Sequence, residues 1–158
     1  MNLKFSQIDL TFQQEMVNRT FPDLKTAIIN KSILKIEGIL KNQNWEHDYI
    51  IKVFYHSRDL NEVYIINPNI IKHPDLHISQ EGQLCLYYPL HISPFKNFWV
   101  TQDLIFQTIK WIYCYESWKL NGHMWKCDEM PHGHYARIGR WLNLKDVHLG
   151  LNYERPQS

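Results

Sequence analysis

The residue best suited to chemistry is Cys85, which lies between Leu84 and Leu86 at the end of a segment with two histidines, a proline and a glycine (73–86). In an arbitrary protein, a cysteine between leucines is more often a small buried core residue. A cysteine thiolate is also a strong nucleophile, and a thioester formed on it stays reactive toward amines. An ordinary thiol is only a few per cent ionised at pH 7, and a carrier enzyme can work from that state. The sequence therefore indicates Cys85 as a candidate site of acyl exchange.

The other cysteines, Cys114 and Cys127, complete an odd set of three. A chain of this size does not depend on disulfides, so the set favours a reduced compartment and leaves at least one thiol free. Cys114 falls within a predicted helix, and we expect it to be inert.

A rival chemistry is metal binding by four potential ligands in the last third of the chain, which are His123, Cys127, His132 and His134. Their spacing does not match the paired ligands of common structural zinc sites. Packing of these histidines on Trp125 and Trp141 is the alternative. We therefore predict no metal and no cofactor.

Composition limits the functions that the chain can have. Its 158 residues are 44% hydrophobic, which fits one domain over 1–158 with a substantial core. The formal charge is +1, so no global field attracts nucleic acid or an anionic membrane. No apolar run approaches the roughly 20 residues that span a bilayer, and no signal peptide is visible. We expect a cytoplasmic protein.

The first two thirds of the chain predict elements that could position Cys85. Apolar residues at steps of three and four from Phe5 to Met16 indicate a helix that ends near Phe21-Pro22. Three stretches with period-two patterning indicate strands, and short polar breaks between them favour an antiparallel meander. These predicted strands cover 34–37, 49–55 and 63–66.

The segment from 67 to 98 carries four prolines and little periodicity, yet its aromatic and leucine residues favour a packed loop. A second helix is predicted from a cap at Thr101, with Asp103 in its first turn, to Leu120, and its broad apolar face should cover the sheet. From about 123 the chain looks less regular, with a short last helix over 137–144. These elements together predict an α+β domain.

The order of these elements, with His73-Pro74 and Leu84-Cys85-Leu86 in the long loop, resembles that of ubiquitin-conjugating enzymes. That family has a His-Pro-Asn signature shortly before an Ile/Val-Cys-Leu active site. The resemblance covers most of the chain and implies the ubiquitin-conjugating (UBC-like) fold. It departs from the usual pattern because Asp75, ten residues before Cys85, follows the His-Pro. His77 occupies the position eight residues before Cys85 where the family has its Asn.

A histidine near this position, and a tail with Gly122, Trp125, Glu129 and His132, are similar to bacterial conjugating-enzyme-like proteins encoded beside cGAS-like nucleotidyltransferases in anti-phage (CBASS) operons. The resemblance implies that Cys85 and His77 are catalytic, with His73, Asp75, Glu129 and His132 in support. His73 is expected to be structural, holding the loop through backbone hydrogen bonds. His77 would donate a hydrogen bond to an oxyanion or act as a base, and the sequence leaves both roles open.

The function implied by this resemblance is a thioester-forming transferase that accepts the C-terminus of a partner protein. The expected partner is the cGAS-like nucleotidyltransferase of the same operon. No Gly-rich phosphate loop is present in the sequence, so activation of the carboxyl group is expected to come from elsewhere. Two alternatives are a catalytically silent binding module with the same fold and a zinc-stabilised adaptor built on the histidine-rich tail.

Overall fold

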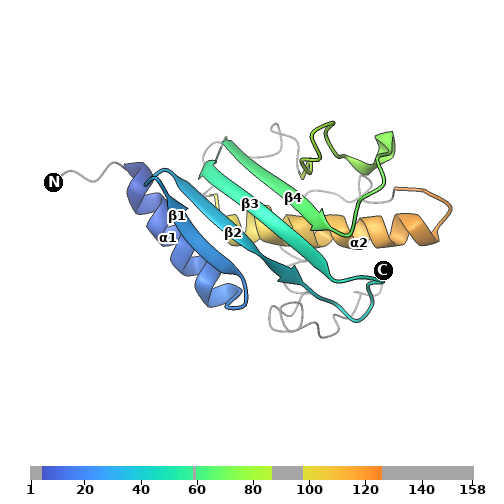
Figure 1. Cartoon of the computed structure of the whole chain (residues 1–158), viewed down its shortest axis with the longest axis horizontal. Coiled ribbons are helices and arrows are strands. Elements are labelled where there is room, and N and C mark those ends of the chain that lie inside the picture. Colours follow the sequence, from blue (N-terminus) through green and yellow to red (C-terminus); the bar gives the residue numbers. More distant parts are fainter. Residues whose placement is uncertain (1–4, 59, 87–97, 126–158) are drawn as a thin grey trace.

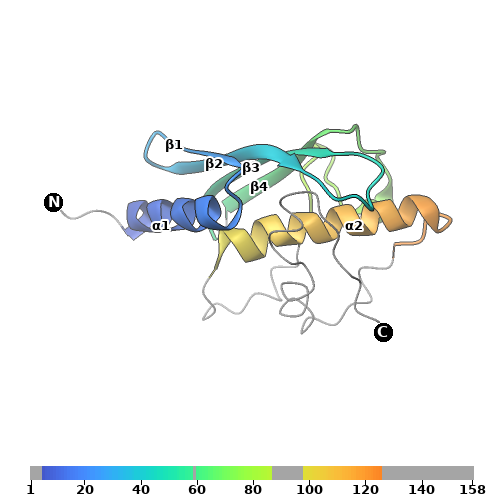
Figure 2. The ribbon, with the colours of Figure 1, turned by 90° about the horizontal axis from the view of Figure 1, so that it is seen from below.

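The sheet and the two long helices form two layers. The structure is a computed structural model that describes residues 5–58, 60–86 and 98–125. Its elements follow the order α1, β1, β2, β3, β4, η1, η3, α2. Figure 1 shows the sheet face-on with α2 crossing behind it, and Figure 2 shows both helices on the same side of the sheet. The architecture is therefore α+β, as predicted.

The sheet is an antiparallel meander in the order β1-β2-β3-β4. Its strands are β1 (Lys25–Ile29), β2 (Ile33–Leu40), β3 (Tyr49–Ser57) and β4 (Leu60–Asn67). The three predicted strands lie within β2, β3 and β4. The strand β1 was not predicted. It is an edge strand of five residues with no fully buried side chain, so its alternating pattern is weak.

Burial alternates along β3, and this alternation shows that the sheet has one apolar face. Tyr49, Ile51, Val53 and Tyr55 are buried, whereas the residues between them are half-buried on the opposite face. Successive side chains of a strand point to opposite faces, so this pattern directs one face toward the helices. The helix layer covers that face.

The first helix, α1 (Phe5–Thr20), has the predicted extent but a different buried stripe. Leu10, Gln13 and Val17 are buried, whereas Phe12, expected in the stripe, is 48% exposed and lies against Trp99. Gln13 can be buried because both the nitrogen and the oxygen of its side-chain amide are hydrogen-bonded. Its Nε2 donates to the carbonyl of Phe98 at 2.8 Å, and its Oε1 accepts from the N–H of Val100 at 2.9 Å.

The second helix begins as a π-helical stretch, η3 (Val100–Phe106), and continues as α2 (Gln107–Leu120). The predicted cap at Thr101 is wrong, because Thr101 is buried inside the first turn. Asp103 caps the helix instead: its carboxylate accepts from the N–H of Trp99 at 2.7 Å. The predicted end at Leu120 is confirmed.

The predicted apolar face of this helix is confirmed, since the members from Leu104 to Trp118 are buried. Gln107, a polar residue of the same helix, is also buried. Residues 126–158, which include the predicted short helix over 137–144, lie outside the described residues. Within the part that the structure describes, no helix has the length and apolarity to cross a membrane.

A buried carboxylate fastens the β2–β3 loop to the end of α2. Glu116 is 6% exposed and accepts hydrogen bonds from the Tyr49 hydroxyl and, at 3.2 Å, from the Glu46 N–H. Lys119 lies 3.4 Å from Glu116 and 2.7 Å from the Glu46 carboxylate. Burial lowers the pKa of Lys119, but the hydrogen bonds and charges of the two glutamates outweigh it and raise the pKa. The lysine is therefore held charged within this network.

We predict that Glu116→Ala lowers the free energy of unfolding by about 2–3 kcal/mol, because it leaves a buried hydroxyl and a backbone N–H without their acceptor. Urea denaturation followed by circular dichroism measures this loss. Glu15→Ala is the matched control on α1, because its carboxylate is exposed and pairs with the exposed guanidinium of Arg19 on the same helix. That control should change stability by less than about 0.5 kcal/mol, and equal losses in both variants would contradict the prediction.

Candidate functional site

The loop before Cys85 is organised by a short 3₁₀ helix, η1 (Pro74–Leu76). Its cap is His73, whose Nδ1 accepts from the N–H of Asp75 at 3.2 Å. The Asp75 carboxylate also lies 3.6 Å from that nitrogen. The His73 ring therefore contacts both the backbone N–H and the carboxylate of Asp75.

His77 and Cys85 face each other across a tight hairpin-like turn. The N–H of Cys85 donates to the carbonyl of His77 at 2.8 Å, and Ile78 pairs with Leu84 one step further along. The N–H of Ser79 donates to the carbonyl of Gln83 at 2.8 Å, and this bond closes the turn. The histidine eight residues before the cysteine is thus its direct backbone neighbour.

Two anchors hold this turn on the domain. On one side, the N–H of Leu84 donates to the carbonyl of Val63 in β4 at 2.9 Å, and Gln83 pairs with Tyr64. On the other side, Leu76 is completely buried, and the indole N–H of Trp111 in α2 donates to its carbonyl at 2.9 Å. Cys85 is therefore positioned by the sheet and by the covering helix at once.

Cys85 is an exposed, free thiol. Partial burial of the sulfur nevertheless raises the pKa of the Cys85 thiol, since a less hydrated site disfavours the thiolate. In contrast to the exposed, free Cys85, Cys114 is buried in α2 and disulfide-bonded. The odd number of cysteines correctly predicted a free thiol but gave no sign of the bond at Cys114.

Aromatic rings gather around both histidines of the loop. The His77 ring lies 5.6 Å from that of Trp125, which in turn lies 5.8 Å from Trp111. Further along the helix, His123 stacks on Trp118 at 4.1 Å, and His73 lies 5.2 Å from Trp118. The expected packing of tail histidines on tryptophan thus occurs at His123, but on Trp118.

The remaining expected site residues, Glu129 and His132, lie outside the described residues, as do Cys127, His134 and Trp141. Across 5–58, 60–86 and 98–125, no three His, Cys, Asp or Glu side chains are placed to hold a metal ion. Trp125 was expected to pack against tail histidines, and Trp111 lies on the predicted apolar face of the second helix. Their contacts with the loop depend on tertiary structure and had no sequence signal.

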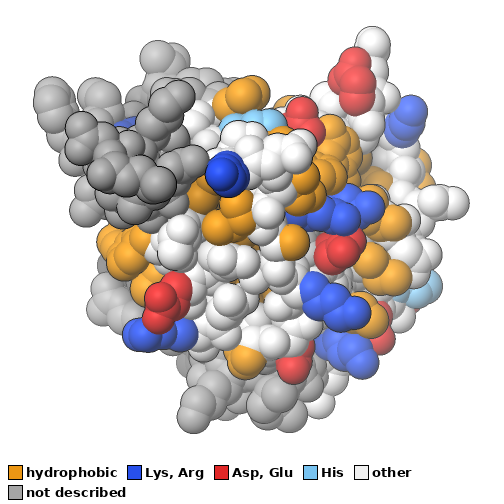
Figure 3. Space-filling model, turned by 60° about the vertical axis from the view of Figure 1, so that its left-hand side comes forward, with side chains coloured by type: hydrophobic (Ala, Val, Ile, Leu, Met, Phe, Trp, Pro, Cys, Tyr) orange, Lys and Arg blue, Asp and Glu red, His pale blue; other side chains and the backbone are white. Residues whose placement is uncertain are grey.

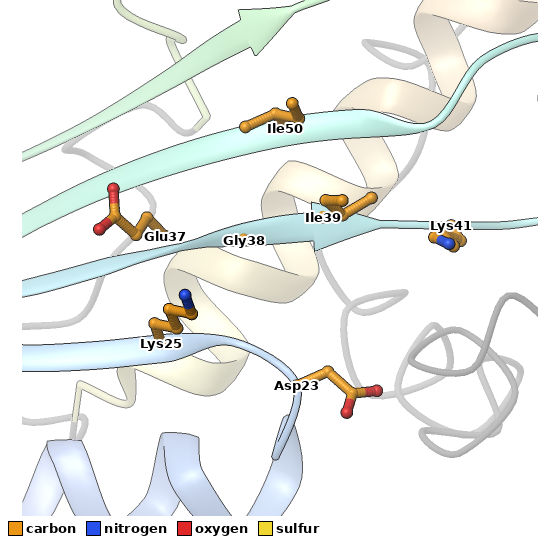
Figure 4. A pocket seen from close by; sticks show the side chains of 7 residues that line it. All are labelled: Asp23, Lys25, Glu37, Gly38, Ile39, Lys41 and Ile50. Carbon is orange, nitrogen blue, oxygen red and sulfur yellow. The ribbon is translucent and has the colours of Figure 1, made fainter.

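A separate groove of about 570 Å³ lies beside β1 and β2, away from Cys85. Figure 4 shows Lys25 and Glu37 extending from neighbouring strands, with Asp23 just before β1. Charges of both signs line it, and Ile39 and Ile50 complete its wall. The face in Figure 3 has the same character, with acidic and basic side chains interspersed among apolar ones. This surface has no single sign that would select a charged partner.

We predict that iodoacetamide labels Cys85 in the native protein and leaves the buried, disulfide-bonded Cys114 unlabelled, and that the Cys85 rate levels off at a higher pH than that of an ordinary cysteine. The raised pKa means that the thiolate, which is the reactive form, accumulates only at higher pH than in an ordinary cysteine. Mass mapping of labelled peptides measures the rate at Cys85 and checks that Cys114 is unlabelled, and an unfolded peptide of residues 80–90 gives the reference pH midpoint. A midpoint below that of the peptide, or equal protection of both cysteines, would contradict this prediction.

The comparisons with known proteins agree with this geometry. A model of the type II CBASS E2 protein family matches residues 13–133, which include the second half of α1, the whole sheet, Cys85 and α2. No curated protein and no solved structure matches the chain significantly. The four-stranded antiparallel sheet with its helices is compatible with an E2-like fold. The match spans well over half of the chain, which therefore belongs to the type II CBASS E2 protein family, E2-like proteins of anti-phage defence operons.

Proposed function

We propose that Cys85 accepts the C-terminus of a partner protein as a thioester, and that the partner is the cGAS-like nucleotidyltransferase of the same operon. The observation that carries this proposal is the position of Cys85, an exposed free thiol on a turn held by both the sheet and α2. A carrier cysteine needs this combination, because another protein's tail must reach a sulfur that does not move away. Membership of a CBASS E2 family supplies the link to the partner.

The proposed reaction begins with a partner whose terminal carboxyl group is already activated as an acyl adenylate or thioester. The Cys85 sulfur attacks the acyl carbon, the bond from that carbon to AMP or to the donor thiol breaks, and the thiol proton passes to solvent or a base. An amine then attacks the new thioester, and Cys85 leaves as the thiol once it regains a proton. No oxidation or reduction occurs in either step.

The raised pKa of Cys85 fits a carrier more closely than a protease-type nucleophile. A protonated thiol at neutral pH reacts slowly with chance electrophiles, and it reacts fast enough with an acyl group that arrives activated. His77 is proposed to act on the second step. It would stabilise the oxyanion or take a proton from the attacking amine, as its backbone contact with Cys85 allows. His73 and Asp75 would support it by holding η1.

The fold proposed for the whole chain is UBC-like, in a single domain over 1–158. Its support is the order of elements: a first helix, an antiparallel meander, an irregular loop that carries the cysteine, and a helix that covers the sheet. The parts of the loop nearest Cys85 are tied to β4, which explains how an irregular segment can hold a reactive residue in place.

We predict a covalent adduct between Cys85 and the C-terminus of the nucleotidyltransferase when the two are co-expressed with the operon's activating components. Non-reducing gels and mass spectrometry would detect it. Hydroxylamine should cleave it, because hydroxylamine attacks thioesters. Cys85→Ser should give a reductant-stable ester or no adduct, since a hydroxyl is a far weaker nucleophile than a thiolate.

Cys85→Ala separates the carrier from the binding module. It should abolish the adduct and preserve noncovalent binding, which would use the surfaces of the helices and the loop. A complex that is noncovalent and identical for wild type and Cys85→Ala would favour the silent binding module. An adduct that reductant cleaves and hydroxylamine does not would be a disulfide, and would refute the thioester.

We predict that His77→Ala slows discharge of the thioester to an amine about a hundredfold without unfolding the domain, because the lost group acts only when charge develops in the transition state. Single-turnover decay of the adduct in the presence of a lysine or hydroxylamine nucleophile measures the rate. Circular dichroism melting checks the fold. A folded variant with an unchanged rate would transfer the role to Asp75 or to a tail histidine.

A further inference from the structure

The backbone around His77 fixes its main chain, and the orientation of its ring depends on side-chain contacts. His77 adopts a left-handed conformation, with φ of 52° and ψ of 49°, and its carbonyl is bonded to the N–H of Cys85. Such a conformation is uncommon outside glycine and persists where the surrounding structure imposes it. Neither constraint limits rotation of the imidazole about its two side-chain torsions.

Trp125 is in contact with that ring. The centroids of the His77 and Trp125 rings are 5.6 Å apart, with the planes inclined at 46°. Trp125 itself is half-buried and packs against the core, 5.8 Å from the Trp111 ring. A half-buried indole that rests on a second indole is well suited to limit the rotation of a smaller aromatic ring.

Trp111 constrains both the backbone just before His77 and the Trp125 ring that contacts His77. It is only 4% exposed and stacks on Tyr115 at 5.3 Å, so its own position is fixed by the core of α2. Its N–H holds the carbonyl of Leu76, the residue immediately before His77, at 2.9 Å. One buried side chain thus holds the backbone that leads into His77 and also supports the ring that touches it.

We infer that Trp125, supported by Trp111, is a positioning residue that holds the imidazole of His77 in the orientation used for transfer at Cys85. This inference deepens the proposed function, and its effect on rate rests on that function. A misplacement of about 1 Å can cost on the order of a hundredfold in rate. Loss of one of several supports for the ring should therefore slow discharge of the thioester by about tenfold.

The neighbouring stack provides a matched control. His123 is exposed, stacks on Trp118 at 4.1 Å and lies 6.4 Å from the ring of His73 in the loop. His123→Ala therefore changes an aromatic contact at the same end of α2 without removing the one that His77 makes. Discharge should stay within about twofold of wild type in this variant.

The test compares wild type, Trp125→Ala, Trp125→Phe and His123→Ala. In Trp125→Ala, discharge of the thioester to hydroxylamine should slow about tenfold at saturating nucleophile, with the half-saturating concentration unchanged. Trp125→Phe, which keeps an aromatic face, should recover the rate to within about twofold. A merely structural role would instead lower the melting temperature of both Trp125 variants and leave the rate of the folded fraction unchanged.

A second readout does not depend on transfer. The His77 ring protons should show a ring-current shift in the NMR spectrum that disappears in Trp125→Ala and remains in His123→Ala. Unchanged His77 resonances in a folded Trp125→Ala would overturn the inference. A lost shift with an undiminished rate would also overturn it. If wild type forms no thioester, the proposed function fails, and the NMR comparison alone decides whether Trp125 orders the ring.

Discussion

The hydrogen bond from the Trp111 indole to the Leu76 carbonyl joins the two parts of this protein that the sequence leaves unconnected. One partner lies in a regular helix and the other in an irregular loop, 35 residues apart. Such a bond contributes about 1 kcal/mol net, but a buried carbonyl without it would cost about 1–3 kcal/mol. Because Leu76 is completely buried, the loop cannot leave α2 without exposing both its side chain and this carbonyl. The position of Cys85 depends on that constraint.

Regular elements were predictable because their residues repeat the period of the element. The predicted strands fall inside β2, β3 and β4, and the predicted face of α2 is buried. The failures have specific causes. β1 is too short and too exposed to show its period. Thr101 has the right chemistry for a cap, but the helix begins one residue earlier, at Val100, which places Thr101 inside the first turn.

The candidate site was predictable only in part. Residue types and spacing, read through a family resemblance, selected His77 and Cys85, and the structure places their main chains in direct contact. No periodicity links a loop to a distant helix, so the roles of Trp111, Trp125 and Val63 required the tertiary structure. The burial of Gln13 and Glu116 was also hidden, because a polar side chain enters a core only where its partners happen to be.

The pairing of Gln83 and Leu84 with β4 has a consequence for self-association. A strand at the edge of a sheet exposes N–H and C=O groups that can pair with another chain and seed aggregates. Here the loop that leads to Cys85 occupies part of the outer edge of β4. The segment that presents the thiol is therefore also a cover for that edge. A sequence change that loosened the loop would uncover strand edge, so the exposure of Cys85 and the solubility of the protein are coupled through the same few backbone bonds.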